Sequence, residues 1–315
     1  MSVPLAYVGI VIIWSTTPLA IKWSGEDVGF LFGVSLRMFI ALLVCFLILT
    51  LMRRKIPLHK QAIHLYFAVG LPLYSAMICV YWAAQSIPSG LISVLFGLTP
   101  IFTGVLATIY LAEKSFSLAK LIGLIISFIG LIVIFHRSLE VGEAMAWGMA
   151  GTVLAAFLHS LGTVWVKNVV GSLPVLTANT GGLVVAVFLF FITWMLMDAS
   201  IPANIPDHAA YSIIYLSIVG SVFGAVLFYF ALKNVSAMSM GLLPLITPVI
   251  ALFIGQQLND EQIEISTLFG TALILSGLVI YQWITIIFES VKKAKIYVSS
   301  EMAGSIRWLR GRRSK

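Results

Sequence analysis

Four cationic or titratable side chains interrupt otherwise apolar segments of this chain, and two of them, His64 and Lys120, lie near segment starts, where they can reach the membrane interface. Arg37 lies nine residues inside the segment 28–52, and His159 lies near the middle of the segment 144–166 with Ser160 and Thr163 beside it. If these segments cross a bilayer, an ionisable group at that depth costs several kcal/mol when charged, so it should face a cavity or a partner. Arg37 and His159 are therefore the first candidates for a functional site.

The two groups suit different chemistry. His159, with an unperturbed pKa of about 6.5, could couple transport to protons, or it could be a neutral, hydrogen-bonded structural histidine. Arg37 keeps its proton. It could bind a substrate carboxylate, pair with the carbonyl end of a half-helix, or reach outward to Glu26 and Asp27, and we slightly favour a structural or gating role.

Aromatic residues are the other candidates, because they could wall a cavity for an amphipathic solute. Trp14, Tyr81, Trp82, Trp165 and Tyr229 fit that description. Aromatic residues near helix ends also form interfacial belts, which suits Trp82 and Trp165 better. Trp14 and Tyr74 lie deeper. The substrate-binding candidates are Trp14, Arg37, Tyr74, Tyr81, His159 and Tyr229.

Several function classes lack their sequence signatures. The chain has no His-Glu-x-x-His, no Gly-x-Ser-x-Gly and no acidic residue within its long apolar segments, so we expect no enzyme and no cofactor. It has no phosphate-binding loop of an ATP-driven pump and no charged ring or filter sequence of a channel. Cys45 and Cys79 fall in apolar segments, which predicts no disulfide and no metal site.

The composition identifies lipid as the main solvent. The chain has 315 residues, of which 60% are hydrophobic and 10% charged, with a mean hydropathy of +1.06. A soluble chain of this size could not bury that much apolar surface. The net charge of +7 comes from loops and the C-terminal tail. It forms no recognition surface for nucleic acid, so no nucleic-acid partner is expected.

Ten segments are long and apolar enough to span a bilayer as helices. They are continuously apolar rather than alternating, which excludes a transmembrane β-barrel. The predicted fold is an all-α integral membrane protein with ten transmembrane helices. The segments are 3–21, 28–52, 62–84, 90–112, 118–135, 144–166, 175–197, 209–232, 238–258 and 266–288.

The distribution of charge predicts the orientation. With ten spans both termini share one side, and placing them in the cytoplasm puts most Lys and Arg residues there and most acidic residues outside. The tail 289–315 is then a basic cytoplasmic tail. It could anchor to lipid headgroups, although a disordered tail is the favoured interpretation.

The two halves of the chain share a pattern of residues. Tyr81 matches Tyr229, Thr99-Pro100 matches Thr247-Pro248, and Glu113 matches Glu261, all at one offset; Gly123 and Gly130 then match Gly270 and Gly277 after a slip of one residue. This predicts a first repeat over 1–136 and a second over 144–288. Five helices per repeat means that the second copy is inverted, as in carriers that work by alternating access.

These residues resemble the EamA-type family of drug/metabolite transporters. The matching elements are Trp14-x3-Pro18-x3-Lys22, Leu36-Arg37, and the two repeat endings Thr99-Pro100…Glu113…Gly123…Gly130 and Thr247-Pro248…Glu261…Gly270…Gly277. The second copy departs from the pattern, with Gly182 in place of Arg37 and His159 in place of Trp14. The resemblance implies two inverted five-helix repeats around a central cavity lined by helices 1, 3, 4, 6, 8 and 9.

The resemblance also implies a function. We expect a secondary transporter, in the export direction, for small metabolites such as amino acids, with a channel or facilitator for small neutral solutes as the alternative. Its partners would be the small-molecule substrate and membrane lipid, in a bacterial plasma membrane; a monomer and a homodimer both remain open. Pro18, Pro100 and Pro248 are hinge candidates, although proline can equally be a packing feature. Glu113 and Glu261 are expected to cap the helix that follows each of them.

Overall fold

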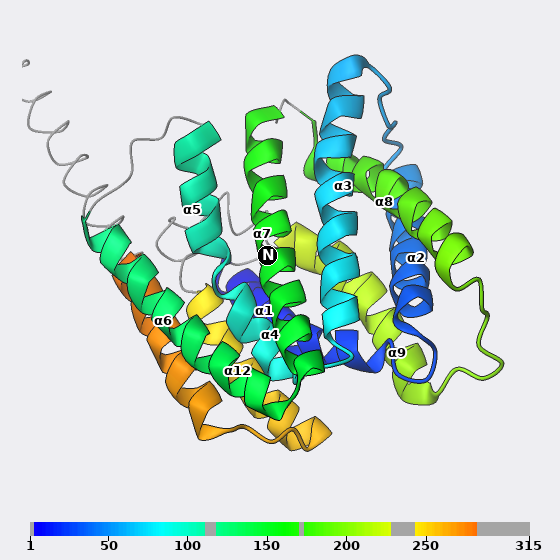
Figure 1. Cartoon of the computed structure of the whole chain (residues 1–315). Coiled ribbons are helices and arrows are strands. Elements are labelled where there is room, and N and C mark those ends of the chain that lie inside the picture. The colour runs from blue at the N-terminus through cyan, green and yellow to red at the C-terminus, as the bar shows by residue number, and fades with distance from the viewer. Residues whose placement is uncertain (1–2, 111–117, 170–172, 228–242, 282–315) are drawn as a thin grey trace, which may run out of the picture.

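The structure is a computed structural model that describes residues 3–110, 118–169, 173–227 and 243–281. All regular secondary structure in these ranges is helical (Figure 1). The first half contains α1 (Val3–Trp23), α2 (Phe30–Leu51), α3 (Lys60–Ala83), α4 (Ser89–Phe96), α5 (Thr99–Tyr110) and α6 (Leu118–Val141). The second half contains α7 (Glu143–Val169), α8 (Val175–Met197), α9 (Asp207–Tyr215), the π-helix η1 (Leu216–Phe223), α12 (Leu243–Asn259) and a last helix, Ile265–Tyr281.

The described helices make this chain a multi-pass membrane protein. Eight helical stretches are long and apolar enough to cross a bilayer, judged by length and composition. Helices suit lipid because each satisfies its own backbone hydrogen bonds. Large apolar side chains such as Leu47, Ile132 and Phe188 are exposed on the outside of these helices. The ninth and tenth predicted segments correspond to α12 and Ile265–Tyr281, and each extends beyond the described residues.

The predicted span 90–112 corresponds to a single candidate span over Ser89–Tyr110, which is interrupted near its middle. Its helix is divided into α4 and α5, with Gly97 and Leu98 between them. Pro100 lacks an N–H, and its ring crowds the carbonyl four residues earlier, that of Phe96. The hydroxyl of Thr99 donates to this carbonyl oxygen at 2.6 Å, and the hydroxyl of Ser160 in α7 donates to the carbonyl oxygen of Thr99 at 3.2 Å.

The matching Thr247-Pro248 pair behaves differently. Pro248 lies inside the continuous helix α12, where the Thr247 hydroxyl donates to the carbonyl oxygen of Leu243 at 2.9 Å. Pro18 likewise lies inside α1. The two Thr-Pro pairs therefore do not produce the same local structure, and the hinge roles of Pro18, Pro100 and Pro248 stay predictions.

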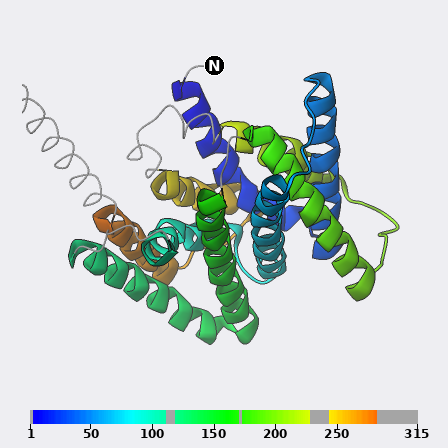
Figure 2. The same ribbon diagram turned by 90° about the horizontal axis from the view of Figure 1, so that it is seen from above.

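Helices α3 and α7 form the centre of the molecule, and small residues let them approach their neighbours. A Cβ on Gly162 of α7 would collide with Pro72 of α3, and a Cβ on Gly70 of α3 would lie 2.5 Å from the carbonyl oxygen of Gly182 in α8. Figure 2 shows α3 and α7 side by side, with α1 on the same side of both. Close approach through small residues is the usual way in which membrane helices pack.

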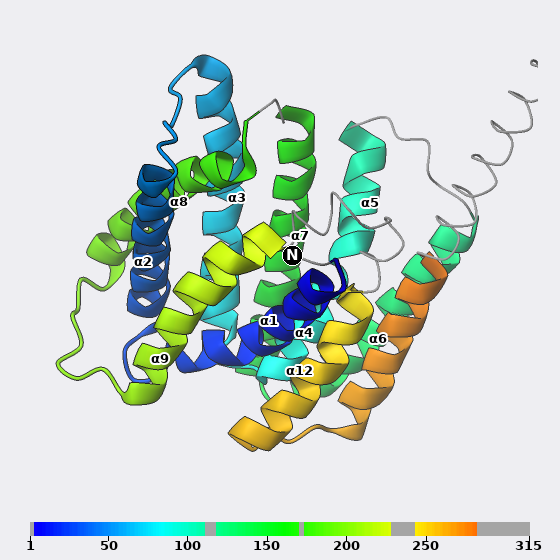
Figure 3. The same ribbon diagram turned by 180° about the vertical axis from the view of Figure 1, so that it is seen from behind.

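Helix α6 and the last helix run antiparallel along one flank (Figures 1 and 3). Their glycines meet in two reciprocal pairs. A Cβ on Gly123 would lie 2.5 Å from the carbonyl oxygen of Gly277, and one on Gly130 would lie 2.6 Å from that of Gly270. The four glycines that match between the two halves of the sequence therefore face one another.

Substituting Gly130 by Val should destabilise the protein by about 1–3 kcal/mol, because the added atoms meet backbone that cannot easily withdraw. The thermal midpoint of the purified protein in detergent would fall. Ile132→Val is the matched control, since Ile132 is on the same helix and 61% exposed. Equal midpoints for the two variants would contradict the importance of this contact.

Candidate functional site

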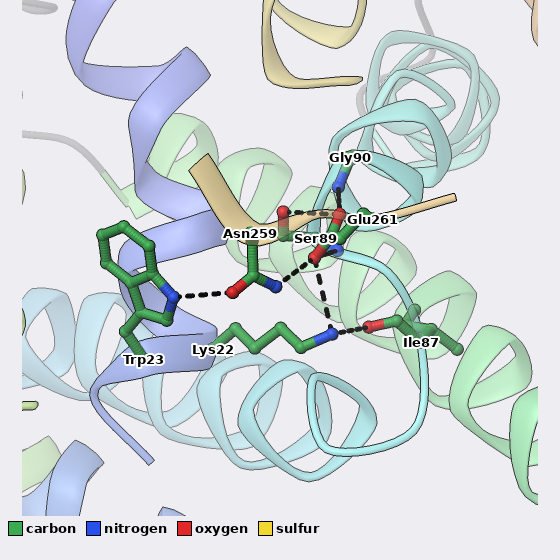
Figure 4. Close-up of polar contacts among 7 residues, drawn as sticks. All are labelled: Lys22, Trp23, Ile87, Ser89, Gly90, Asn259 and Glu261. Atoms are coloured by element: carbon green, nitrogen blue, oxygen red, sulfur yellow. Dashed lines mark hydrogen bonds and ion pairs between the residues drawn. The ribbon is translucent and has the colours of Figure 1, made fainter. Parts of the chain in front are cut away.

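A buried carboxylate joins three helices at one end of the molecule (Figure 4). The side chain of Glu261 is 6% exposed and follows the end of α12. Its Oε1 accepts a hydrogen bond from the backbone N–H of Ser89 at 2.9 Å, and its Oε2 accepts from the Ser89 hydroxyl at 3.0 Å and the Gly90 N–H at 3.3 Å. Glu261 therefore caps the N-terminus of α4.

Helix α4 needs this cap because its own sequence does not supply one. Its N-cap residue is Pro88, which makes no side-chain hydrogen bond to the helix. The first N–H groups of any helix lack intrahelical partners and carry a partial positive charge, so a carboxylate both satisfies and stabilises them. The expectation that Glu261 caps the helix that follows it is wrong, because the carboxylate serves a helix 172 positions earlier in the chain.

The last turn of α1 completes this cluster. Lys22 Nζ lies 3.4 Å from Glu261 Oε1 and donates to the carbonyl oxygen of Ile87 at 3.3 Å. Trp23 Nε1 donates to Asn259 Oδ1 at 2.9 Å, and Asn259 Nδ2 donates to Glu261 Oε1 at 3.0 Å. We call Lys22, Trp23, Ser89, Asn259 and Glu261 the Glu261 cluster; it fastens α1, α4 and α12 to one another.

Glycines bring α4 and α12 close enough for these bonds. A Cβ on Gly90 would lie 2.7 Å from Cα of Leu252, and one on Gly255 would collide with the Glu261 carboxylate. A side chain at position 90 would push the two helices apart, and one at position 255 would displace the Glu261 carboxylate. The short distances of the Glu261 cluster therefore depend on both glycines.

Two surface pockets flank the cluster. One of about 380 Å³ is lined by Gln256, Gln257, Asp260, Glu261 and Gln262. The other, of about 260 Å³, lies between Pro88, Leu252 and the stretch from Glu261 to Thr267. Glu261 lines both pockets.

A second ion pair links the two halves at the same end. Arg137 at the end of α6 donates to Glu264 at 2.9 Å, and it also pairs with Glu140. The Arg137 guanidinium, with help from the Ser266 hydroxyl, lowers the pKa of Glu264 from its ordinary value. A lowered carboxyl pKa favours folding at neutral pH, and this contribution is lost as the pH falls through the lowered pKa. Both side chains are exposed, so the effect is small.

Arg37 and Tyr81 are the two predicted site residues that the structure brings together. Arg37 of α2 is 6% exposed, and Tyr81 of α3 is 1% exposed. Nη1 of Arg37 donates to the Tyr81 hydroxyl at 3.1 Å, and Nε donates to the Ser221 hydroxyl at 3.3 Å. The Tyr81 hydroxyl also accepts from Ser24 at the end of α1, at 3.3 Å. Arg37 does not reach Glu26, whose carboxylate lies 3.5 Å from His208.

The π-helix η1 presents Ser221 to Arg37. In this eight-residue segment the Ser221 hydroxyl donates to the carbonyl oxygen of Leu216, five residues earlier, at 3.0 Å. Single π-helical turns inside α-helices occur frequently at functional sites. No sequence signal predicted this one.

His159 marks a change along one face of α7. Gly162 contacts α3 and Ser160 contacts Thr99, so His159 and Thr163 lie on the face between these two contacts. On that face Thr152 and Ala156 are buried, whereas His159 and Thr163 are exposed. On this face exposure therefore increases toward the C-terminal end of α7, the end opposite the Glu261 cluster (Figure 1). The imidazole lies beside the ring of Phe96, with 6.3 Å between the ring centroids.

The other predicted site residues lie apart. Trp14 is partly buried against the apolar cluster of Ile10, Val11 and Leu243, between α1 and α12. The Tyr74 hydroxyl lies 2.5 Å from that of Thr193, and its ring packs on Phe190 at 4.9 Å, so Tyr74 faces α8. Tyr229 lies outside the described residues.

The Glu261 cluster is the functional feature that sequence reasoning missed as a site. Lys22 and Glu261 were both noticed as parts of the repeated pattern. The sequence contained one signal for this site. Lys22 and Glu261 carry opposite charges, each flanks an apolar segment, and both were predicted on the same side of the membrane. Their contact could not be read from the sequence because 239 positions separate them.

Comparisons with known proteins agree on one family. The model of the EamA-like transporter family matches residues 1–136 and 146–282. The uncharacterized transporter YoaV of Bacillus subtilis is 26% identical over 88% of this chain and 96% of its own length. A protein of Escherichia coli named a probable amino-acid metabolite efflux pump is 24% identical over 86% of this chain and 91% of its own length.

A solved structure shows the same fold. One crystal structure superposes with a TM-score of 0.64 at 16% sequence identity, covering 91% of this chain and 99% of the other.

Replacing Glu261 by Gln should cost about 2–4 kcal/mol of stability, because the amide has one acceptor oxygen in place of two, and its NH2 group would face donors of Ser89 and Gly90. The thermal midpoint in detergent measures the loss. Glu264→Gln changes an exposed carboxylate of the same loop and should have little effect. Equal losses would mean that the Glu261 cluster does not hold the helices together.

Proposed function

Because the chain belongs to the EamA-like transporter family, we propose that it is a secondary transporter that exports small metabolites such as amino acids by alternating access. Family membership makes it a transporter rather than an enzyme. The substrate class draws support from the E. coli relative, which is named a probable amino-acid metabolite efflux pump.

The observation that carries alternating access is the difference between the two ends of the helix bundle. At one end the Glu261 cluster fastens α1, α4 and α12 together. Toward the other end the inner face of α7 becomes exposed at His159 and Thr163. A carrier open to one side and sealed on the other has this arrangement, and the seal consists of polar contacts that can separate and re-form.

The inverted repeat of five helices per half belongs to the same proposal. A twofold axis lying between α6 and the last helix would exchange Gly123 with Gly270 and Gly130 with Gly277. The contact between Gly123 and Gly277 would then become the contact between Gly270 and Gly130. Both contacts are present, and this reciprocity is expected of a symmetric interface.

Charge supports the orientation. Acidic residues gather at the sealed end, among them Glu26, Glu140, Asp260 and Glu264, while Arg53, Arg54, Lys55 and Lys60 lie in and beside the loop between α2 and α3 at the other end. The positive-inside rule places the basic loop in the cytoplasm. The conformation is then open to the cytoplasm, with both termini on that side.

Counterflow in proteoliposomes tests the transport function. Vesicles preloaded with a mixed pool of neutral amino acids should take up labelled amino acid faster than empty vesicles, and the uptake should saturate. Uptake saturates because the number of binding sites is limited, and it is accelerated because a carrier that returns loaded reorients faster than an empty one. Flux that neither saturates nor responds to the internal pool would favour a channel or facilitator instead.

His159 can be tested in the same vesicles under a pH gradient. If His159 carries the coupled proton, His159→Ala should retain exchange and lose the acceleration by the gradient, because the imidazole is the titratable group on the exposed face of α7. His208→Ala, on the sealed end, is the matched control. If the pH gradient still accelerates uptake in His159→Ala, His159 does not carry the coupled proton and only lines the cavity.

A disulfide across the seal tests whether the Glu261 cluster opens during transport. A Cβ on Gly255 would lie 2.9 Å from the Ser89 hydroxyl oxygen, close to the separation of about 3 Å between a Cβ and the far sulfur of a disulfide. The test uses the double variant Ser89→Cys/Gly255→Cys in a protein whose Cys45 and Cys79 have been replaced. Oxidation of this variant should stop transport, and a reductant should restore the activity that the variant had before oxidation. Each single variant is the control, because it disturbs the Glu261 carboxylate in the same way without forming a cross-link. Full activity of the cross-linked protein would exclude the cluster as a gate.

A further inference from the structure

We infer that Arg37 binds the carboxylate of the transported solute, in a site formed by α2, Tyr81 of α3 and the π-helix η1. The inference rests on the proposed transport function and names the chemical group that the carrier recognises. None of the sequence patterns assigned this role to Arg37 over a structural one. The surroundings of the guanidinium favour the binding role over the structural role.

The first argument is charge. Arg37 is 6% exposed and lies within the membrane-spanning helix α2. Its described partners, the hydroxyls of Tyr81 and Ser221 and the ring of Tyr81 at 5.9 Å, are all neutral. Among the described residues no carboxylate lies within 4.0 Å of it. A buried cation without a counter-ion is costly, and an anionic ligand would supply the missing charge.

The second argument is geometry. Nε and Nη1 donate to Ser221 and Tyr81, while Nη2 has no hydrogen-bond partner among the described residues. Nη2 faces Gly220 of η1, and a Cβ added there would lie 3.6 Å from Nη2, in ordinary van der Waals contact. Gly220 itself adds no side chain beside this nitrogen. The N–H groups of Nη2 are therefore donors from which a carboxylate can accept.

The third argument is that Arg37 is not needed to satisfy its neighbours. The Tyr81 hydroxyl also accepts from Ser24, and the Ser221 hydroxyl also donates to the Leu216 carbonyl oxygen. Removing the guanidinium therefore leaves neither hydroxyl without a partner. A residue that served only to hold α2, α3 and η1 together would be expected to leave an orphaned polar group when deleted.

The charge of Arg37, which has no carboxylate within 4.0 Å among the described residues, also selects the ligand. A carboxylate carries one negative charge, which Arg37 alone can neutralise, whereas a phosphate ester carries nearly two. Lys22, at the same end of the bundle, is already paired with Glu261. The site therefore fits a monocarboxylate group, as in a zwitterionic amino acid, better than a phosphate.

Counterflow with matched solute pools tests the inference. The pools are the neutral L-amino acids and their carboxamides, which have nearly the same shape and lack the negative charge. Wild type should prefer the acids by at least about tenfold, and Arg37→Met should lose that preference. Arg37→Lys should keep part of it, because the charge remains and the fork is lost. Arg137→Met, which removes an exposed arginine, is the matched control.

Thermal unfolding in detergent gives a readout that does not depend on transport. Acetate, compared with chloride at equal ionic strength, should raise the thermal midpoint of wild type and of Arg37→Lys and leave Arg37→Met unchanged. Without added carboxylate, Arg37→Met should unfold at the same temperature as wild type or higher, because a buried unpaired charge has been removed. A purely structural arginine would instead lower the midpoint when deleted.

The outcomes separate this inference from the proposed function. If wild type shows equal counterflow with acids and amides, or if Arg37→Met still prefers the acids, the role of Arg37 is overturned. The proposal that the protein is a carrier is not affected by either result. Absence of counterflow with either pool in wild type removes amino acids from the proposed function. In that case the effect of acetate on the thermal midpoint alone tests the carboxylate site. An equal shift of the midpoint in wild type and in Arg37→Met overturns it.

Discussion

The contact between Glu261 and the first N–H groups of α4 is the interaction on which the arrangement of the helices depends. Helix α4 begins at Ser89, its N-cap residue Pro88 supplies no side-chain hydrogen bond, and its first N–H groups have no partner within the helix. A carboxylate from the second half of the chain supplies the acceptors, and Lys22 from α1 balances its charge. Three helices that are distant in sequence thereby share one polar centre.

Elsewhere the helices meet through glycines, which provide close contact but few polar bonds. The contacts at Gly162, Gly70, Gly123 and Gly130 are shape-dependent and apolar, and they suit helices that move as stable pairs. The Glu261 cluster differs, since it is compact and made of directional bonds. A structure that combines tightly packed helix pairs with one localised polar seal can change its access without repacking its core.

The polar residues within the membrane-spanning helices divide into satisfied and unsatisfied groups. Tyr74 and Thr193 satisfy each other, and Thr99 satisfies the carbonyl that Pro100 leaves free. Arg37 is different, because its neutral partners do not offset its charge. Proteins commonly keep such destabilising groups where function requires them, and the adjoining π-helical segment is a second departure from regular structure at the same place.

The sequence by itself determined the solvent, the helical class, most of the spans and the family, because hydropathy, charge distribution and the Thr-Pro, Glu and Gly pattern are local properties of the chain. It also singled out Arg37 and Tyr81, although not their contact. Only the tertiary structure decided that Glu261 caps α4, that Tyr74 faces α8 and that Ser221 reaches Arg37. The physical reason is that a polar side chain in lipid must find a partner, while the choice of partner depends on how distant helices pack.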